Sequence, residues 1–269
     1  MTGPPPTPTV LAAFGLANQP RPLVAPTWVV DDVVLKPETD HGLQAWLGTE
    51  VAGVERRGYR MAEALAAVDG SWVVDGWAAS RWVEGTSVPE AGPTPERWAL
   101  ALEGGRAFHR SVAGLRRPSF IDRRDSWWAR ADRRAWGAAG AAEPVAPLAA
   151  TAALLERTCR PLGESQVVHA DLGGNVLLAE ELDPAVIDVS PYWRPPAYAE
   201  GVLVADALCW YGGDARLLDD LGVPVPAVAR AMLFRLWTTH ERVTAGVGLD
   251  DLEGEALAYA AAAAAICSA

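Results

Sequence analysis

Four polar residues in the middle of the chain have types and a spacing suited to chemistry on phosphates. An apolar run delivers His169 and Asp171 into a glycine-containing turn, and Asn175 opens the next apolar run. Thirteen residues later a third apolar run, Ala-Val-Ile, ends on Asp188. In metal-assisted phosphoryl transfer, one carboxylate orients the acceptor hydroxyl and accepts its proton, while an amide oxygen and a second carboxylate hold magnesium. The pattern therefore predicts this chemistry.

The structural alternative is a hairpin whose turn contains Asp, Gly and Asn, because these residue types are the usual choices in turns. That alternative leaves Asp188 without an explanation. It also leaves unexplained the small β-rich segment that opens the chain.

The elements that must position these residues differ between the two ends of the chain. In the first 85 residues, β-branched runs and turn residues predict two hairpins and one helix: Thr27–Val30 with Val33–Lys36, Ser71–Val74 with Trp77–Val83, and the helix Glu38–Val54. This part is predicted to be a small sheet with one helix laid on it.

After Gly85 the pattern becomes helical, with one β-rich interval. Apolar residues recur at helical spacing in Arg97–Ala113, Ala149–Arg160, Gly201–Tyr211, Val225–Val243 and Leu252–Ile266. Strands are predicted at Gln166–His169, Asn175–Ala179 and Ala185–Val189. The predicted fold class is α+β, with a small N-terminal lobe over residues 1–85 and a larger helical lobe over residues 86–269.

The combined pattern resembles the aminoglycoside phosphotransferase-like small-molecule kinases. Their catalytic loop reads His-Gly-Asp, then a few residues and Asn, and a following strand ends on Asp. The resemblance implies a two-lobed protein-kinase-like fold, with Asp171 as catalytic base and with Asn175 and Asp188 as magnesium ligands. It also implies a structural role for His169 and makes Asp206 the helix residue that braces the catalytic loop.

The resemblance further implies a nucleotide site for ATP, or GTP, with Mg²⁺. Lys36 looks like the kinase lysine that contacts the α- and β-phosphates. For its acidic partner on the next helix, Glu50 is a better candidate than Glu38, which lies too early. The alternative for Lys36 is a solvated strand-edge lysine. Four residues fall where the hinge of the family joins the lobes: Arg81, Trp82, Val83 and Glu84. Backbone groups of such a hinge would bind adenine. The alternative is that these residues form an ordinary strand end.

Two features depart from the family pattern. The spacing from Asp171 to Asn175 is one residue shorter than usual, and the segment 23–27, where a phosphate-covering loop is expected, contains no glycine. They motivate an alternative from another class, a pseudokinase that binds nucleotide or serves as a scaffold without turnover. A third alternative is a non-catalytic globular protein that carries the motif by chance.

Composition and charge limit the kinds of partner that the protein is expected to bind. A net charge of -11 argues against nucleic acid, since phosphate-backbone binding needs clustered Lys and Arg. The charge suits a cationic small-molecule acceptor and equally serves solubility. The alanine run 260–265 is too short to span a bilayer, so no membrane partner is expected. Three widely spaced cysteines favour a reducing cytoplasm. The aromatic segment Pro191–Pro196 either lines the acceptor pocket or anchors a proline-stiffened loop.

Overall fold

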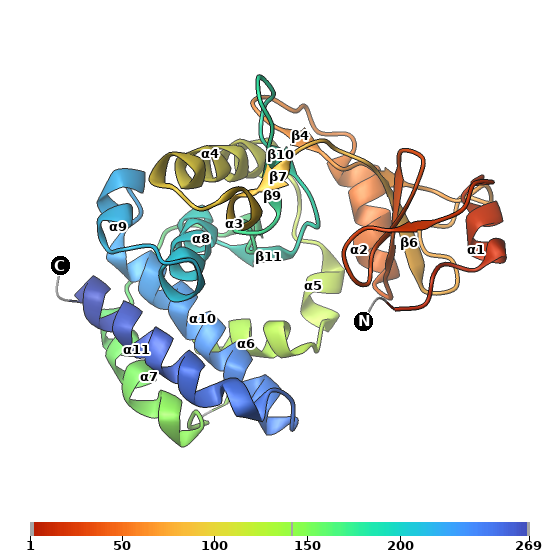
Figure 1. The fold of residues 1–269 in the computed structure, drawn as a ribbon. Coiled ribbons are helices and arrows are strands. Elements are labelled where there is room, and N and C mark those ends of the chain that lie inside the picture. The colour runs from red at the N-terminus through yellow and green to blue at the C-terminus, as the bar shows by residue number, and fades with distance from the viewer. Residues whose placement is uncertain (1–2, 141, 268–269) are drawn as a thin grey trace.

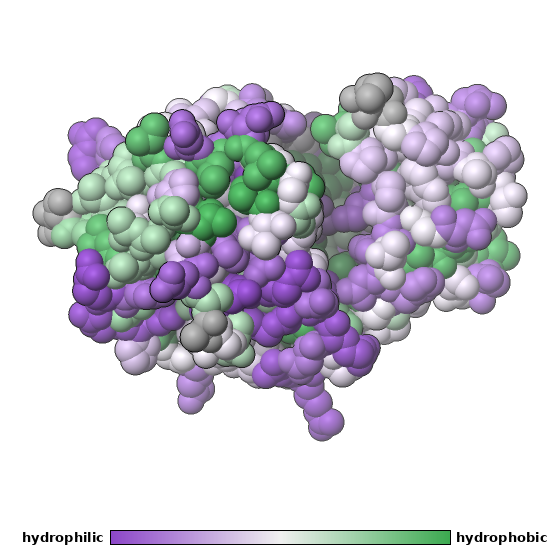
Figure 2. Space-filling model, turned by 90° about the horizontal axis from the view of Figure 1, so that it is seen from below, coloured by the Kyte–Doolittle hydropathy of each residue, from purple (hydrophilic) through white to green (hydrophobic). Residues whose placement is uncertain are grey.

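The protein has a small β-rich lobe and a larger helical lobe (Figure 1). The structure is a computed structural model that describes residues 3–140 and 142–267. A hollow separates the two lobes on the face drawn in Figure 2. The predicted α+β fold class, with β structure first and helices after it, is confirmed.

The small lobe is built on an antiparallel five-stranded sheet. In spatial order its strands are β1 (Arg21–Pro22), β2 (Trp28–Val30), β3 (Val33–Pro37), β6 (Trp77–Arg81) and β5 (Ala64–Leu65). The predicted first hairpin is confirmed, because β2 and β3 pair in register through Val30 and Val33.

Alternation along β3 decides which side chains reach the space between the lobes. Val33 and Leu35 are buried in a small core with Val10 of helix α1 (Pro8–Ala13). Successive side chains of a strand point to opposite faces, so Val34 and Lys36 lie on the other face of the sheet. Both of them line the interlobe cavity.

The predicted helix 38–54 forms as two pieces, the α-helix α2 (His41–Trp46) and a π-helical turn at Leu47–Val51. Its start is later than predicted because the Glu38 carboxylate accepts the amides of the next two residues. Asp40 then serves as N-cap by accepting the Leu43 amide at 2.9 Å. The second predicted hairpin is reduced to β6 and a single bridge between Val74 and Trp77.

The large lobe contains every long helix that the sequence predicted. Its helices are α3 (Val88–Ala91), α4 (Pro95–Val112), α5 (Ser119–Arg123), α6 (Trp127–Ala135), α7 (Ala146–Thr158), α8 (Pro196–Trp210), α9 (Arg216–Leu221), α10 (Val225–Thr244) and α11 (Leu252–Cys267). Helix α10 lies at the centre, in contact with α6, α7, α8 and α11 (Figure 1). Helices α3, α5, α6 and α9 were not predicted. The signal of α6 is weak because this helix is rich in arginine and buries mainly small alanines.

Two small sheets hold the segment that contains His169, Asp171, Asn175 and Asp188. The first has the order β4 (Arg60–Met61), β10 (Ala185–Val186), β9 (Val176–Leu178) and β7 (Thr86–Ser87). The second pairs β8 (Gln166–His169) with β11 (Pro191–Arg194), so the aromatic segment expected as a loop starts as a strand. Strand β4 precedes residue 85 yet pairs with β10, which shows that the chain crosses between the lobes more than once.

None of the helices within residues 3–140 and 142–267 has the length and apolar character needed to cross a membrane. The alanine run belongs to α11, whose Ala262 and Ala263 are buried in the large-lobe core.

Candidate active site

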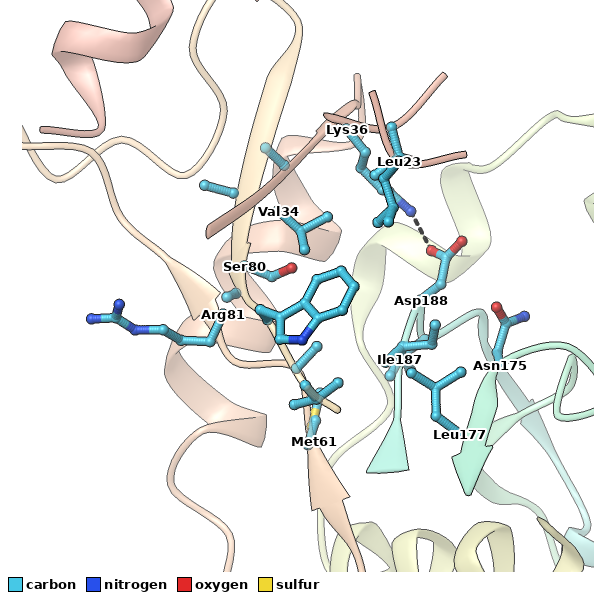
Figure 3. A pocket seen from close by; sticks show the side chains of 18 of the residues that line it. Leu23, Val34, Lys36, Met61, Ser80, Arg81, Asn175, Leu177, Ile187 and Asp188 are labelled. Carbon is cyan, nitrogen blue, oxygen red and sulfur yellow. Dashed lines mark hydrogen bonds and ion pairs between the residues drawn. The ribbon is translucent and has the colours of Figure 1, made fainter. Parts of the chain in front are cut away.

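A cavity of about 470 Å³ lies between the lobes, within the size range of ligand pockets. Val34 and Met61 face it from one side, and Leu177 and Ile187 face it from the other (Figure 3). The result is an apolar slot that could sandwich a flat ring. Its mouth is polar, since Lys36, Asn175 and Asp188 also line it.

Three of the four hinge residues predicted from the sequence line this cavity, and one does not. Arg81, Trp82 and Val83 line the cavity. Glu84 is not among the lining residues, and its carbonyl instead accepts a hydrogen bond from Arg60 Nη2 at 2.9 Å.

Lys36 and Asp188 form an ion pair across the cavity mouth, which joins the small lobe to the large one (Figure 3). Asp188 has a φ of +44°, in the left-handed region that few residues other than glycine adopt. The chain therefore turns sharply after β10. Asp tolerates this conformation better than bulky residues do.

The predicted pairing of Lys36 with Glu50 is not present. Glu50 is exposed and does not line the cavity, whereas Leu43, Gln44 and Leu47 do. Residue 50 follows Leu43 by seven positions and would share its face in a regular α-helix. The π-helical turn changes that phase. The carboxylate beside Lys36 is that of Asp188.

Asn175 connects the candidate base to the cavity mouth. Its Nδ2 donates to Asp171 Oδ2 at 3.0 Å and to the Asp171 carbonyl at 2.8 Å. Because the amide nitrogen is used in this way, the Asn175 side-chain oxygen is left for another partner. The Ile187 amide donates to the Asn175 carbonyl at 2.9 Å, which ties Asn175 to the residue before Asp188.

The donor set of Asn175 and Asp188 fits magnesium. Both offer hard oxygen ligands, and both line the same cavity mouth. Within the described ranges, no cluster of three or more His, Cys, Asp or Glu side chains forms a metal site. Magnesium usually needs only one or two carboxylates, because substrate phosphates and water fill its other positions. An ion held by this pair would therefore depend on phosphate oxygens.

Two buried histidines support strand β8 and the segment that pairs with it. His169 Nδ1 accepts the Ser190 amide at 3.1 Å, which supports the segment after Asp188. His109 Nε2 accepts the His169 amide at 3.0 Å. Burial lowers the pKa of His169 and lowers that of His109 to about 3, so both rings are neutral acceptors at neutral pH. The part played by His109 was not predicted, because nothing in its local sequence marks it.

Asp206 is buried on α8, and Arg235 of α10 lies between it and Asp171. The guanidinium donates to both carboxylate oxygens of Asp206, from Nε at 2.7 Å and from Nη2 at 2.6 Å. The same Nη2 donates to Asp171 Oδ1 at 2.7 Å. Burial alone would lower the pKa of Arg235, but the two carboxylates hold it well above its ordinary value. Arg235 was missed, although a lone charge in the apolar run Met-Leu-Phe-Arg-Leu-Trp signals a buried partner.

Neither a family model nor a curated protein matches the chain. Solved structures do match it over nearly their whole length. One is an aminoglycoside phosphotransferase from Alicyclobacillus acidocaldarius subsp. acidocaldarius DSM 446, with a TM-score of 0.64 and 15% identity, covering 100% of this chain and 95% of the other. The chain has the protein-kinase-like fold of the aminoglycoside phosphotransferases.

Two further structures share this kinase-like fold with the chain. A choline/ethanolamine kinase family protein from Mesorhizobium loti matches with a TM-score of 0.61 and 17% identity, covering 98% of this chain and 92% of the other. A spectinomycin phosphotransferase, solved with ADP and spectinomycin, matches with a TM-score of 0.56 and 12% identity, covering 93% and 91%. The predicted fold is thereby confirmed.

Proposed function

We propose that this kinase-fold protein is an ATP-dependent phosphotransferase that phosphorylates a hydroxyl of a small molecule, such as an aminosugar, an aminoglycoside or an amino alcohol. The observation that carries the proposal is the meeting of Lys36, Asn175 and Asp188 at the mouth of one apolar cavity, with Asp171 bonded to Asn175. Solved relatives of the same fold hold ADP or AMP-PNP, which supports a nucleotide as donor.

In this proposal the apolar slot takes the adenine ring of ATP, or the guanine ring of GTP, and the hinge supplies backbone hydrogen bonds. The amides of Arg81 and Trp82 already donate to Glu63 and Asp32, at 2.8 Å and 2.7 Å. Val83 is therefore the hinge residue assigned to donate to the base. Lys36 would leave Asp188 and bind the phosphates, which is the charge-stabilising role that phosphoryl transfer needs.

Asp171 would orient the acceptor hydroxyl and accept its proton. Its carboxylate is partly open to solvent, with 41% of the side chain exposed, and can therefore receive a ligand. Asn175 and Asp188 would hold magnesium, which when bound neutralises charge on the phosphates. The net charge of -11 supports a cationic acceptor, since a negative protein concentrates cations near its surface.

The test is a product screen. Aminosugars, aminoglycosides and amino alcohols are incubated with Mg-ATP and the protein, and phosphorylated products are detected by mass spectrometry. Asp171→Asn is the inactive control, and Asp219→Asn, at an exposed residue that lines no cavity described for this protein, is the matched active control. A product that forms equally with Asp171→Asn would reject the proposal.

A second candidate function, nucleotide binding without turnover, is favoured by the phosphate-covering segment. The Leu23 amide donates to the Thr27 carbonyl at 3.0 Å, the Thr27 amide donates to the Val24 carbonyl at 2.5 Å, and Pro26 has no amide hydrogen. Few amides are left there to hold a phosphate. Binding of Mg-ATP in calorimetry, with no product from any acceptor, would favour this candidate.

A further inference from the structure

We infer that Arg235 of α10 is the positioning residue for Asp171, so that the acceptor-orienting carboxylate is aimed from the helical core as well as from its own loop. This inference rests on the proposed function, because Asp171 orients an acceptor only if the protein transfers phosphate. It adds to the site a residue that no sequence pattern assigned.

The guanidinium of Arg235 makes two kinds of contact. It is anchored by two hydrogen bonds to Asp206, whose side chain is only 8% exposed. It also donates from Nη2 to Asp171 Oδ1 at 2.7 Å. Exposure rises along this chain of contacts, from 8% for Asp206 through 15% for Arg235 to 41% for Asp171. In this chain of contacts the buried anchor is thus linked to the carboxylate that is most open to a ligand.

Asp171 is held at both oxygens, by Arg235 on Oδ1 and by Asn175 on Oδ2. A carboxylate has about four lone-pair positions, so each oxygen can still accept one more hydrogen bond. Two fixed contacts select one side-chain rotation and leave the remaining lone pairs pointing in set directions. Preorganisation of this kind matters, because a 1 Å misplacement can lower a rate by about 100-fold.

The brace expected from Asp206 therefore acts through Arg235. Both oxygens of Asp206 accept from the guanidinium, and no hydrogen bond joins Asp206 to a catalytic-loop amide within the part of the chain that the structure describes. Arg235 comes from α10, which packs against α6, α7, α8 and α11. The position of Asp171 is consequently linked to the packing of the helical lobe.

The test is a double-mutant cycle on turnover with an acceptor found in the screen. Arg235→Met is expected to lower kcat by about 10- to 100-fold while the KM for ATP stays within about twofold. In the Asp171→Asn background the same substitution should change the residual kcat little, because the group it positions is gone. Arg235→Lys should recover part of kcat, since it restores a donor without the two-point anchor.

Arg106 of α4 provides the control. Its Nη2 donates to Glu200 Oε2 of α8 at 2.7 Å and to the Leu221 carbonyl at 3.1 Å, and the two side chains are 29% and 14% exposed. Arg106→Met removes a partly buried ion pair between two helices that does not touch Asp171 or line the cavity, so it should lower stability and leave kcat near that of the wild type. If Arg235→Met does not fold, the double variant Arg235→Met with Asp206→Asn is used in its place, because it removes both buried charges.

Crystal structures of the same variants separate failure of this inference from failure of the proposed function. If the wild type phosphorylates no acceptor, the proposed function fails, and the position of Asp171 still decides the role of Arg235. We expect the Asp171 carboxylate to turn or become disordered without Arg235 and to stay in place in Arg106→Met. An unmoved Asp171, an unchanged kcat in a folded variant, or an equal loss of kcat in the Asp171→Asn background would overturn the inference.

Discussion

The proposed chemistry depends on a few side chains that are held by specific neighbours. Asp171, Asn175 and Asp188 were predicted from residue types and spacing, because strands that end on such residues are visible in sequence. Arg235 and His109 act through contacts between segments 60 or more residues apart, at His109 with His169 and at Arg235 with Asp171. Sequence spacing alone cannot show such contacts.

At this scale, the neutral histidines predict a loss of stability in acid. Unfolded His109 binds a proton below its ordinary pKa of 6.5, whereas the folded ring stays neutral down to about 3. The free energy of unfolding should therefore decrease as pH falls from 6.5, by up to about 1.4 kcal/mol per pH unit from this group. Urea unfolding of wild type and His109→Gln between pH 6.5 and 5 measures it. Parallel pH dependences in the two proteins would contradict the account.

The proposed magnesium ligands give a second prediction for single residues. Asp188→Asn removes a hard anionic ligand from the cavity mouth and also the partner of Lys36. Calorimetric binding of ATP should then gain little from added Mg²⁺, whereas Asp183→Asn, whose residue does not line the cavity, should keep the wild-type gain. An equal gain from Mg²⁺ in both variants would exclude Asp188 as a ligand.

Among the elements, we expect the segment 23–27 to limit the strength of phosphate binding. Its glycine-free backbone uses the Leu23 and Thr27 amides internally, so one or two charge-assisted hydrogen bonds to phosphate are missing. Their loss costs about 2–4 kcal/mol. We predict that ATP alone binds at roughly hundreds of micromolar or weaker and that adenosine competes almost as well. A low-micromolar dissociation constant for ATP, with much weaker adenosine, would contradict this.

Elements whose formation depends on a local apolar pattern could be predicted from the sequence, whereas elements that depend on contacts with distant segments could not. Helices α4, α7, α8, α10 and α11 were predicted because each contains a long run with apolar residues at helical spacing. The π-helical turn that removes Glu50 from the cavity has no local signal, since it reflects packing. Strand β11 was missed because its pairing partner, β8, lies more than twenty residues earlier in the chain.

For the molecule as a whole, two polar contacts between the lobes bear on nucleotide binding. One is the ion pair of Lys36 with Asp188. The other is Arg124, which donates to Asp40 at the start of α2 at 3.0 Å and to the Pro191 carbonyl in β11 at 3.0 Å. Nucleotide binding would exchange the first contact and leave the second as the fixed connection.

Arg124→Met should therefore weaken nucleotide binding without touching the cavity. A partly buried ion pair contributes about 1 kcal/mol, which corresponds to about fivefold in the KM for ATP. Arg123→Met is the control, because its guanidinium bonds only Ser119 within α5. Steady-state kinetics at varied ATP concentration measure the effect. An unchanged KM for ATP would show that this contact does not set the lobe arrangement.

The central claim, that Asp171 serves phosphoryl transfer to a small-molecule hydroxyl, is tested most directly by comparing turnover and nucleotide binding in one substitution. Asp171→Asn keeps the size of the side chain and one of its two oxygens. That oxygen can still accept a hydrogen bond from Arg235 or from Asn175, but the side chain can no longer take up a proton. We predict that kcat falls by about 100- to 10,000-fold while the dissociation constant for Mg-ATP changes less than about threefold. A folded Asp171→Asn protein that phosphorylates the acceptor at the wild-type rate would contradict the account.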